Sequence, residues 1–498
     1  MTTSIAPSTR PSARPVLGSL AEISRLLVLN TDSYKTSHWL QYPPDTTAVF
    51  SYIESRGGVH DRTVFFGLQY ILNEYFSRPV TAADVTLAAE VCALHGVPFN
   101  AEGWMHIVMR HGGRLPVRIM AVPEGSVVPT NNVLLTIENT DPSCAWLTSY
   151  LETALMRLWY PITVATNCWM ARQLIAGFLE DTGDTAGLPY KLHDFGARGV
   201  SSLESALIGG MAHLVNFQGT DNISAVLGAR AFYGEPMAGY SIPAAEHSTI
   251  TSWGRDGELD AYRNMLRQYA KPGAIVAVVS DSYDLDNAVR NLWGFALRQE
   301  VIDSGATVVI RPDSGDPSTM VLDTVRALDA SFGSVTNAKG FKVLQHVRVI
   351  QGDGITVRSI RSILVALKVN GYSADNVTFG QGGALLQTVN RDDQRFAMKC
   401  SAAQVGGSWR DVFKDPVTDP HKRSKAGRLM LLRKDQDYQT VRLDSHELER
   451  LEAEGWQRAL REVFVDGEPL VEDTLSVIRQ RAQQAAQGYK VGYFSAAA

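Results

Sequence analysis

The sequence contains few cysteines, and those few lie far apart. Among its 498 residues the only four are Cys92, Cys144, Cys168 and Cys400, and none belongs to a Cys-x-x-Cys pair. This spacing suggests neither a disulfide framework nor a zinc site. A reducing compartment fits the pattern, and we expect a cytoplasmic protein.

Excess positive charge and long apolar runs are absent as well. The net charge of −5 and the pI near 6.1 leave no basic surplus for a nucleic-acid backbone. The most apolar run, residues 274–279, is far too short to span a bilayer, and residues 1–20 lack the apolar stretch of a signal peptide. We therefore expect neither nucleic acid nor a membrane as partner. Prolines recur within residues 1–20, which favours a disordered tail there.

The rest of the chain has an ordinary globular composition, with 45% hydrophobic and 20% charged residues. Its length predicts two or three domains, because a single core rarely grows so large. Apolar spacing in the first part predicts strands, helices and antiparallel turns. The predicted elements are strands over 25–30 and 46–56, a helix over 65–76, antiparallel strands over 115–139, and helices over 144–180 that break at Pro161.

The second part repeats one pattern, in which an apolar strand ends in a polar or glycine-rich loop. The predicted strands cover residues 274–279, 307–310, 347–350 and 376–379, and the loops that follow them are 280–284, 311–316, 351–354 and 380–383. Helical stretches follow most of these loops, as in βα units with a parallel sheet. Ligands bind at the carboxyl ends of such strands, so the loops are the expected site.

The loops contain the groups that a phosphorylated sugar needs. Carboxylate oxygens suit Mg²⁺ or ribose hydroxyls, and glycines let backbone amides approach a phosphate. Arginine and lysine can bind phosphate oxygens directly. The candidates are Asp281, Asp284, Asp313, Asp316, Asp353, Gly352, Gly354, Gly380, Gly382, Gly383, Arg311, Arg391, Lys399 and a cationic loop at 414–428. A plain barrel without phosphate ligands is the alternative.

Two earlier segments offer groups for a flat ligand. Phe195 and Arg198 lie in a glycine-containing loop, where Phe195 could stack on a ring. The alternative is that Phe195 only fills the core. Asp221 follows an apolar helix, and its carboxylate could accept a hydrogen bond from an amide NH₂ or could cap the next helix.

Residues 239–250 place Glu246 next to His247, with Ser248 and Thr249 directly after them. Histidine can act as a base or as a nucleophile toward phosphorus near neutral pH. The alternative is a helix N-terminus capped by Ser248, with a solvated His247.

At these residues the sequence resembles the nicotinamide phosphoribosyltransferase family. The resemblance covers about residues 27–464 and rests on motifs in the same order: TDSYK, TVFFGLQYIL, AVPEG, NTDPS, WYPITVATN, YKLHDFGARGVSS, NFQGTD, YSIPAAEHSTIT, VVSDSYD, IRPDSGDP, VIQGDG, FGQGGALLQ and FKDPVTDPHKRSKAGR. It implies an α/β fold of two domains, of the type II phosphoribosyltransferase kind. One domain is an irregular α/β barrel-like domain over 166–394. The other is an α+β domain rich in antiparallel strands, over 21–165 and about 395–498.

The resemblance also implies the reaction and the partners. Nicotinamide and 5-phosphoribosyl 1-diphosphate give nicotinamide mononucleotide and diphosphate, with Mg²⁺, in a homodimer whose two active sites lie at the subunit interface. ATP phosphorylates His247, with Glu246 as its support, and this coupling drives synthesis in NAD salvage.

Roles for the site residues come from the same resemblance. Phe195 and the partner chain's Tyr34 sandwich the nicotinamide ring, Asp221 accepts the carboxamide NH₂, and Arg198 lies nearby. The implied ribose, phosphate and metal residues are Arg311, Asp313, Gly352, Asp353, Gly382, Gly383, Arg56, Arg391, Lys399 and Asp284, with Mg²⁺ near Asp284 and Asp313.

The sequence departs from the family pattern in three places. Ala197 stands where members carry tyrosine, Ala397 stands where they carry serine, and the segment from Arg56 to Thr63 is short. A nicotinate phosphoribosyltransferase is the nearest alternative, but Asp221 would repel a substrate carboxylate. A binding or signalling protein without turnover is the alternative from another class.

Overall fold

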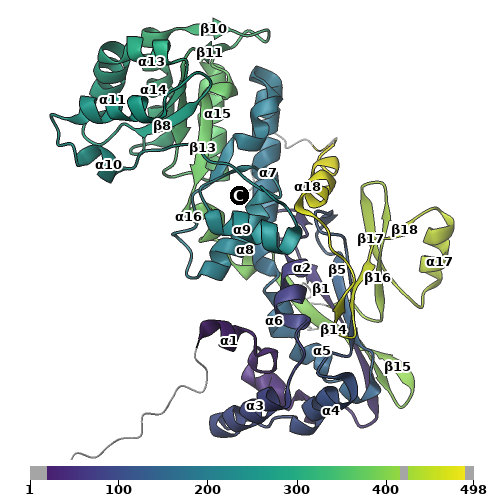
Figure 1. The fold of residues 1–498 in the computed structure, drawn as a ribbon. Coiled ribbons are helices and arrows are strands. Elements are labelled where there is room, and N and C mark those ends of the chain that lie inside the picture. Colours follow the sequence, from purple (N-terminus) through teal and green to yellow (C-terminus); the bar gives the residue numbers. More distant parts are fainter. Residues whose placement is uncertain (1–18, 416–423, 488, 490–498) are drawn as a thin grey trace, which may run out of the picture.

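The structure is a computed structural model that describes residues 19–415, 424–487 and 489. It contains two large sheets that differ in strand direction and are built from different parts of the chain (Figure 1). The fold is therefore mixed α/β, with one parallel, half-barrel sheet and one antiparallel sheet, as the sequence predicts. The predicted residue boundaries of the two domains stay a prediction.

The antiparallel sheet combines strands from both ends of the chain. Its seven strands lie in the order β15-β14-β1-β5-β3-β19-β20. They are β1 (Thr46–Ser55), β3 (Val117–Ala121), β5 (Val133–Asn139), β14 (Phe396–Val405), β15 (Ser408–Asp411), β19 (Arg461–Val465) and β20 (Glu468–Pro469). Because β1 pairs with both β5 and β14, a late segment of the chain lies beside the first strand.

The parallel sheet contains the strands predicted in the second part of the chain. Its order is β7-β6-β13-β12-β9-β8, with every neighbouring pair parallel. The strands are β6 (Leu192–Asp194), β7 (Gly219–Thr220), β8 (Ile275–Val279), β9 (Thr307–Arg311), β12 (Val347–Gln351) and β13 (Val377–Gln381). β8 is apolar along its length and mostly buried, as expected of a strand in a sheet covered on both faces.

Helices begin just beyond the polar loops at the strand ends. Asp316 caps α14 (Pro317–Phe332) by accepting the Thr319 N–H at 2.9 Å, and Pro317 occupies the first helical position. Thr356 caps α15 (Val357–Val369) in the same way. The other helices of this part are α8 (Leu203–Leu214), α9 (Ile223–Tyr233), α10 (His247–Thr251), α11 (Glu258–Tyr269), α12 (Leu285–Asn287), α13 (Arg298–Ser304) and α16 (Gly383–Leu386).

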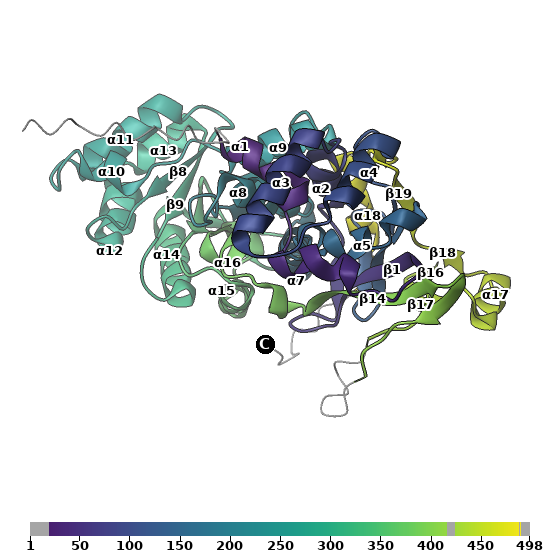
Figure 2. The ribbon, with the colours of Figure 1, turned by 90° about the horizontal axis from the view of Figure 1, so that it is seen from below.

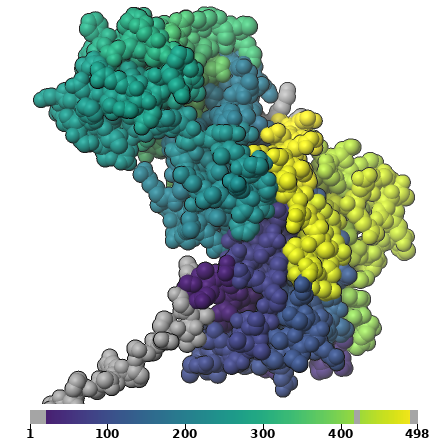
Figure 3. Space-filling view, viewed as in Figure 1, coloured from purple at the N-terminus to yellow at the C-terminus, as the bar shows by residue number. Residues whose placement is uncertain are grey.

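The long helix α7 (Trp159–Thr182) joins the two parts of the molecule. It packs against α8 and α15 beside the parallel sheet and against β2 (Arg62–Val64), which pairs with β4 (Val127–Pro129). The helices around the antiparallel sheet are α1 (Leu20–Ser24), α2 (Leu68–Ile71), α3 (Ala82–His95), α4 (Ala101–His111), α5 (Leu147–Tyr150), α6 (Glu152–Met156) and α18 (Leu475–Gln484). In Figure 3 the surfaces of α8 and α9 lie between the teal and green part, which contains the parallel sheet, and the purple N-terminal part.

A small three-stranded sheet extends from one end of the molecule. It consists of β16 (Leu429–Lys434), β17 (Asp437–Arg442) and β18 (Gln457–Arg458), with α17 (His446–Ala453) beside it. In both Figure 1 and Figure 2 this unit lies opposite α10 and α11. A two-stranded ribbon, β10 (Ser334–Thr336) and β11 (Lys342–Leu344), lies near the parallel sheet.

Two predicted elements are wrong. Residues 25–30 form a turn of 3₁₀ helix at Leu27–Leu29 rather than a strand, because Asn30 N–H donates to the Leu27 carbonyl at 3.0 Å and turns the chain. Pro161 does not break a helix either. It lies in the first turn of α7, where a missing N–H costs no helical hydrogen bond, and the break comes earlier, at residues 157–158.

All four cysteines are free thiols. Within the described ranges, no helix combines the length and the apolar character that crossing a bilayer requires.

Candidate active site

A mostly apolar cavity of about 380 Å³ opens at the parallel sheet. Its walls include Ala277, Val309 and Ile350, which come from the three neighbouring strands β8, β9 and β12. The half-buried ring of Phe195 closes one side. This ring packs directly on Gly380, where an added Cβ would lie 1.9 Å from Phe195 Cε2. Phe195 therefore lines a cavity, and the alternative that it only fills the core is wrong.

Asp221 supplies a carboxylate to the same cavity. Its Oδ1 accepts the Ser241 hydroxyl at 2.6 Å, and its backbone N–H donates to the carbonyl of Asp194 at 3.0 Å. The cap of α9 is Asn222 and not Asp221, so the capping alternative for Asp221 is also wrong. The carboxylate is exposed to the cavity and can accept hydrogen bonds from a ligand.

Sequence reasoning missed Asp194, which holds the loop of Phe195 in place. Asp194 is fully buried, and its carboxylate accepts the Gly196 N–H at 2.7 Å and the Asn222 amide at 2.9 Å. Burial raises the pKa of Asp194 to about 6, although these two hydrogen bonds act in the opposite direction. The sequence feature that could have identified Asp194 is its position directly before Phe195 in the DFGARG motif.

Sequence reasoning also missed His193, which lines the apolar cavity. Burial lowers the pKa of His193 to about 4, and the nearby Asp221 carboxylate only partly opposes this shift. The imidazole is therefore neutral near pH 7 and adds no charge to the cavity.

A second cavity, of about 460 Å³, is polar and rich in glycine. It shares Phe195 and Arg311 with the apolar cavity, so the two adjoin. Nine predicted residues meet in its lining: Phe195, Arg198, Arg311, Asp313, Gly352, Asp353, Gly354, Gly382 and Gly383. The structure thus brings these loop residues together at the carboxyl ends of the strands, as predicted.

Arg311 is fixed in this cavity by Asp313. Its Nε and Nη2 donate to the two carboxylate oxygens at 3.0 and 2.5 Å. Burial disfavours the charged guanidinium, but the hydrogen bonds to Asp313 and the negative charges of Asp313, Asp281 and Asp221 together outweigh burial and leave the pKa of Arg311 above its ordinary value. The cation is therefore held in one orientation between the apolar and the polar cavity.

His247 lies at the start of α10 and is paired with Asp281. Its Nε2 lies 2.9 Å from Asp281 Oδ1, and its side chain is 47% exposed. The helix cap is Glu246, so the alternative of a cap by Ser248 is wrong. Glu246 accepts the hydroxyl of Ser248, and its N–H donates to Thr249 Oγ1 at 3.2 Å. The carboxylate that contacts His247 is thus Asp281.

The predicted magnesium residues are carboxylates on two neighbouring loops. Asp284 caps α12, with Oδ1 accepting the Asn287 N–H at 3.0 Å. The carboxylate of Asp313 accepts hydrogen bonds from Arg311. Neither belongs to a preformed cluster of three metal-ligand side chains among the described residues. Mg²⁺ commonly binds through one or two carboxylates plus substrate phosphates, so the residues fit an ion that arrives with a diphosphate.

Seven predicted site residues line neither cavity of this chain. Three are the predicted catalytic residues Glu246, His247 and Asp284. The other four are predicted substrate-binding residues: Tyr34, Arg56, Arg391 and Lys399. All four lie in or beside the antiparallel sheet. Tyr34 is 60% exposed on the 3₁₀ helix Ser33–Leu40, and Arg391 is exposed directly before β14.

Arg56, directly after β1, and Lys399, on the neighbouring strand β14, belong to a cluster of positive charge. Arg56 Nε donates to Glu54 at 3.0 Å, whereas its Nη2 is buried and has no hydrogen-bond partner among the described residues. Burial lowers the pKa of Lys399, and the charges of Arg56 and Lys35 lower it further. An anion placed here would satisfy Arg56 and relieve this repulsion. The cationic loop at 414–428 lies partly outside the described residues.

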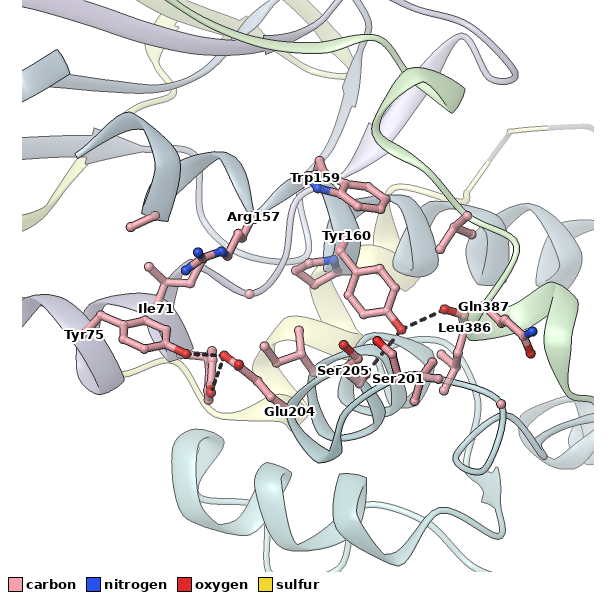
Figure 4. A pocket seen from close by; sticks show the side chains of 18 residues that line it. Ile71, Tyr75, Arg157, Trp159, Tyr160, Ser201, Glu204, Ser205, Leu386 and Gln387 are labelled. Carbon is pink, nitrogen blue, oxygen red and sulfur yellow. Dashed lines mark hydrogen bonds between the residues drawn. The ribbon is translucent and has the colours of Figure 1, made fainter. Parts of the chain in front are cut away.

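A third cavity, of about 540 Å³, was not foreseen from the sequence (Figure 4). It lies between α7, α8 and residues 70–75 and shares Gly199 and Gln387 with the polar cavity. Glu204 accepts the hydroxyls of Tyr70 and Tyr75 there. On the other side, Tyr160 donates to the Leu386 carbonyl at 2.9 Å.

The site joins a mostly apolar cavity to a glycine-rich, arginine-containing one, a combination that suits the ring and the sugar phosphate of a phosphoribosyltransferase. Comparison with family models agrees. Residues 190–468 match the nicotinate phosphoribosyltransferase (NAPRTase) family, and residues 26–119 match the nicotinamide phosphoribosyltransferase N-terminal domain.

Curated relatives agree with the family models. A nicotinamide phosphoribosyltransferase of Xanthomonas campestris pv. campestris is 60% identical over 463 residues, which cover 92% of this chain and 98% of that protein. One of Acinetobacter baylyi is 32% identical and covers 92% of this chain and 97% of its own length. The chain belongs to the nicotinamide phosphoribosyltransferase family. It is an enzyme of the pentosyltransferase class.

Solved structures support the fold at low sequence identity. Nicotinate-nucleotide pyrophosphorylase from Pyrococcus furiosus superposes with a TM-score of 0.60 at 16% identity, covering 95% of this chain and 98% of that one. Human nicotinic acid phosphoribosyltransferase superposes with a TM-score of 0.54 at 19% identity, covering 92% of this chain and 93% of that one. The roles that the family resemblance implies for individual side chains stay predictions.

Proposed function

We propose that this enzyme forms nicotinamide mononucleotide and diphosphate from nicotinamide and 5-phosphoribosyl 1-diphosphate, in NAD salvage. The observation that supports this most is the pair of adjoining cavities, which share Phe195 and Arg311. The apolar cavity suits a flat ring, and the glycine-rich cavity suits a ribose phosphate. The name of the 60% identical relative supports nicotinamide as the base.

The carboxylate of Asp221 favours the amide over the acid as substrate. An ionised side chain in this cavity repels a substrate carboxylate but accepts a carboxamide N–H. Phe195 provides a face for the ring, and Arg198 lies at the border of the polar cavity. Nicotinate is therefore the weaker candidate substrate.

In the transfer step, the ring nitrogen of nicotinamide attacks C1 of the ribose. The bond from C1 to the diphosphate oxygen breaks, and the diphosphate leaves with the electron pair. The transition state resembles an oxocarbenium ion, so it is stabilised by placed charges rather than by a strong nucleophile. Arg311, oriented by Asp313, and the backbone amides of Gly382 and Gly383 in the lining of the polar cavity would bind phosphate oxygens. Mg²⁺ held near Asp284 and Asp313 would neutralise charge on the diphosphate.

Coupling to ATP is assigned to His247. Because a carboxylate only accepts hydrogen bonds, the proton of the neutral imidazole lies on Nε2 toward Asp281, which leaves the lone pair on Nδ1. That nitrogen attacks the γ-phosphorus of ATP, and ADP leaves. Asp281 would then stabilise the positively charged imidazolium ring of the phosphohistidine.

A homodimer with shared active sites explains the predicted substrate-binding residues that lie outside the cavities of this chain. Tyr34, Arg56, Arg391 and Lys399 would come from the partner. The unpaired Nη2 of Arg56 and the lowered pKa of Lys399 suit a phosphate-binding role of this kind. The scattered free cysteines support a cytoplasmic location.

The decisive experiment is product formation by the purified protein with each base. Mononucleotide is measured with nicotinamide or nicotinate, 5-phosphoribosyl 1-diphosphate and Mg²⁺, with and without ATP. The proposal expects product from nicotinamide, increased by ATP. A preference for nicotinate would reassign the base, and no product with either base would favour a binding protein without turnover.

A further inference from the structure

A cluster of histidine, aspartate and cysteine side chains lies outside the active site. His106 and His111 lie on α4. Asp141 caps the short 3₁₀ turn Pro142–Cys144 that follows β5, and Cys144 is the last residue of that turn. In Figure 1, α4 lies at the opposite end of the molecule from the parallel sheet. The proposed reaction does not use these side chains.

The ligand atoms of His106, Asp141 and Cys144 converge, and His111 contacts the same carboxylate. Nε2 of His106 and Nε2 of His111 each lie 2.7 Å from the same oxygen, Oδ2 of Asp141. The ligand atoms of His106, Asp141 and Cys144 all lie within 4.8 Å of one another, and no second group of this kind occurs in the described ranges. Hydrogen bonds alone would explain two histidines on one carboxylate. They do not explain why the buried thiol of Cys144 lies at the same point.

The backbone around the cluster is firmly held. The other oxygen of Asp141 accepts the Ser143 N–H at 2.8 Å, and the Asp141 carbonyl accepts the Asn139 amide at 2.8 Å. Trp104, two residues before His106 and fully buried, packs edge-to-face on Trp146 beyond the turn. The groups therefore converge without a large change in fold.

We propose that His106, His111, Asp141 and Cys144 bind one zinc-type divalent transition metal ion. Two imidazole nitrogens, a carboxylate and a thiolate form the tetrahedral N/O/S set that Zn²⁺ binds, whereas Mg²⁺ and Ca²⁺ prefer oxygens alone. Four protein ligands leave no open position, which is the pattern of a structural site. Zn–N and Zn–O bonds of about 2.0–2.2 Å require the 2.7 Å contacts to widen modestly around the ion.

Such an ion would stabilise the part of the chain that presents Tyr34. It would tie the end of α4 to the turn before α5, and Tyr150 at the end of α5 accepts the Thr31 hydroxyl through its carbonyl at 2.8 Å. The side chains of His106 and His111 are 32% and 27% exposed, which leaves a path for the metal. The sequence spacing gave no zinc motif because the ligands come from two separate elements.

The test uses the full chain, stripped with a chelator and titrated with Co²⁺ or Zn²⁺. We expect one equivalent per chain, a visible spectrum of tetrahedral cobalt with a thiolate charge-transfer band, and a Zn²⁺-dependent rise in Tm. His106→Ala should lose at least ~100-fold in affinity, since even outer-shell changes cost roughly 10–100-fold. His95→Ala, at an exposed histidine on α3, is the matched control and should bind normally.

Three outcomes would overturn the proposal. They are binding below one equivalent, binding unchanged in both His106→Ala and His111→Ala, and a cobalt spectrum without a thiolate band. Cys144→Ser tests the thiolate directly, because the band should vanish while weaker binding persists. If His106→Ala does not fold, Asp141→Asn together with the spectrum of the unaltered chain gives the same decision.

Discussion

Asp281 and His247 form a hydrogen-bonded pair across two segments that lie 34 positions apart in the chain, with Oδ1 and Nε2 separated by 2.9 Å. His247 is the first residue of α10. Asp281 lies in the loop that follows β8, two residues after the end of the strand. The pairing orients the imidazole and leaves Nδ1 as its nucleophilic nitrogen.

His247→Ala is expected to abolish ATP hydrolysis and the stimulation of synthesis by ATP, while some basal transfer remains. Asp281→Asn should lower the rate of ATP hydrolysis by roughly a hundredfold, the scale of a lost acid–base partner. Glu246→Gln should have a smaller effect, because Glu246 contacts Ser248 rather than the imidazole. ATP stimulation of the His247→Ala enzyme equal to that of the wild type would refute the assignment.

Asp221→Ser is expected to raise the ratio of kcat/KM for nicotinate over nicotinamide by about tenfold, because it removes a like charge from the cavity. Ser241→Ala is the matched control, since it removes the hydroxyl that bonds to Asp221 but keeps the charge. An unchanged ratio in Asp221→Ser would remove this residue from the specificity argument.

Mixing two inactive variants tests the shared site. Tyr34→Ala and Asp313→Ala should each be poorly active alone, and co-expressed chains should recover about a quarter of wild-type activity, because random pairing gives half heterodimers with one intact site each. Recovery no better than the two variants separately would mean that each chain completes its own site.

Gly380→Ala is expected to raise KM for nicotinamide about tenfold, the scale of a lost aromatic contact. Its Cβ would lie 1.9 Å from Phe195 Cε2 and must displace the ring. Gly187→Ala serves as control, because the nearest atom to its Cβ is 3.8 Å away. Equal KM values for the two variants would show that the Phe195 ring does not contact the base.

The buried His213 predicts acid sensitivity of the fold. Burial lowers the pKa of His213 to about 4, and its Nε2 lies 2.9 Å from the Gly219 carbonyl oxygen. An unfolded histidine titrates near pH 6.5, so its contribution is fully present above that pH and is lost as the pH falls toward 4. The loss amounts to roughly 3 kcal/mol at full protonation.

His213→Gln keeps a side-chain donor but cannot titrate, so its Tm should fall less than that of the wild type between pH 6.5 and pH 4. His95→Gln, at an exposed position, should follow the wild-type curve. Parallel curves for the wild type and His213→Gln would contradict the prediction.

Local sequence pattern was sufficient for the parallel strands and for the loops after them. A short apolar run such as residues 275–279 favours a buried strand. The polar loop that follows such a run must then lie at the carboxyl end of the strand. Pattern failed at residues 25–30 and at Pro161, where hydrogen bonds and helical position determine the structure rather than composition.

The sequence by itself determined the class of fold, the family and the loop residues Arg311, Asp313, Gly352 and Gly382, because motif chemistry and strand ends are local properties. Only the tertiary structure decided that Asp281 and not Glu246 contacts His247, that Asp194 supports the Phe195 loop, and that Tyr34 lines neither cavity. These relationships depend on how separate strands are ordered in a sheet and how helices pack beside them. That order arises from burial summed over the whole chain, which no short stretch specifies.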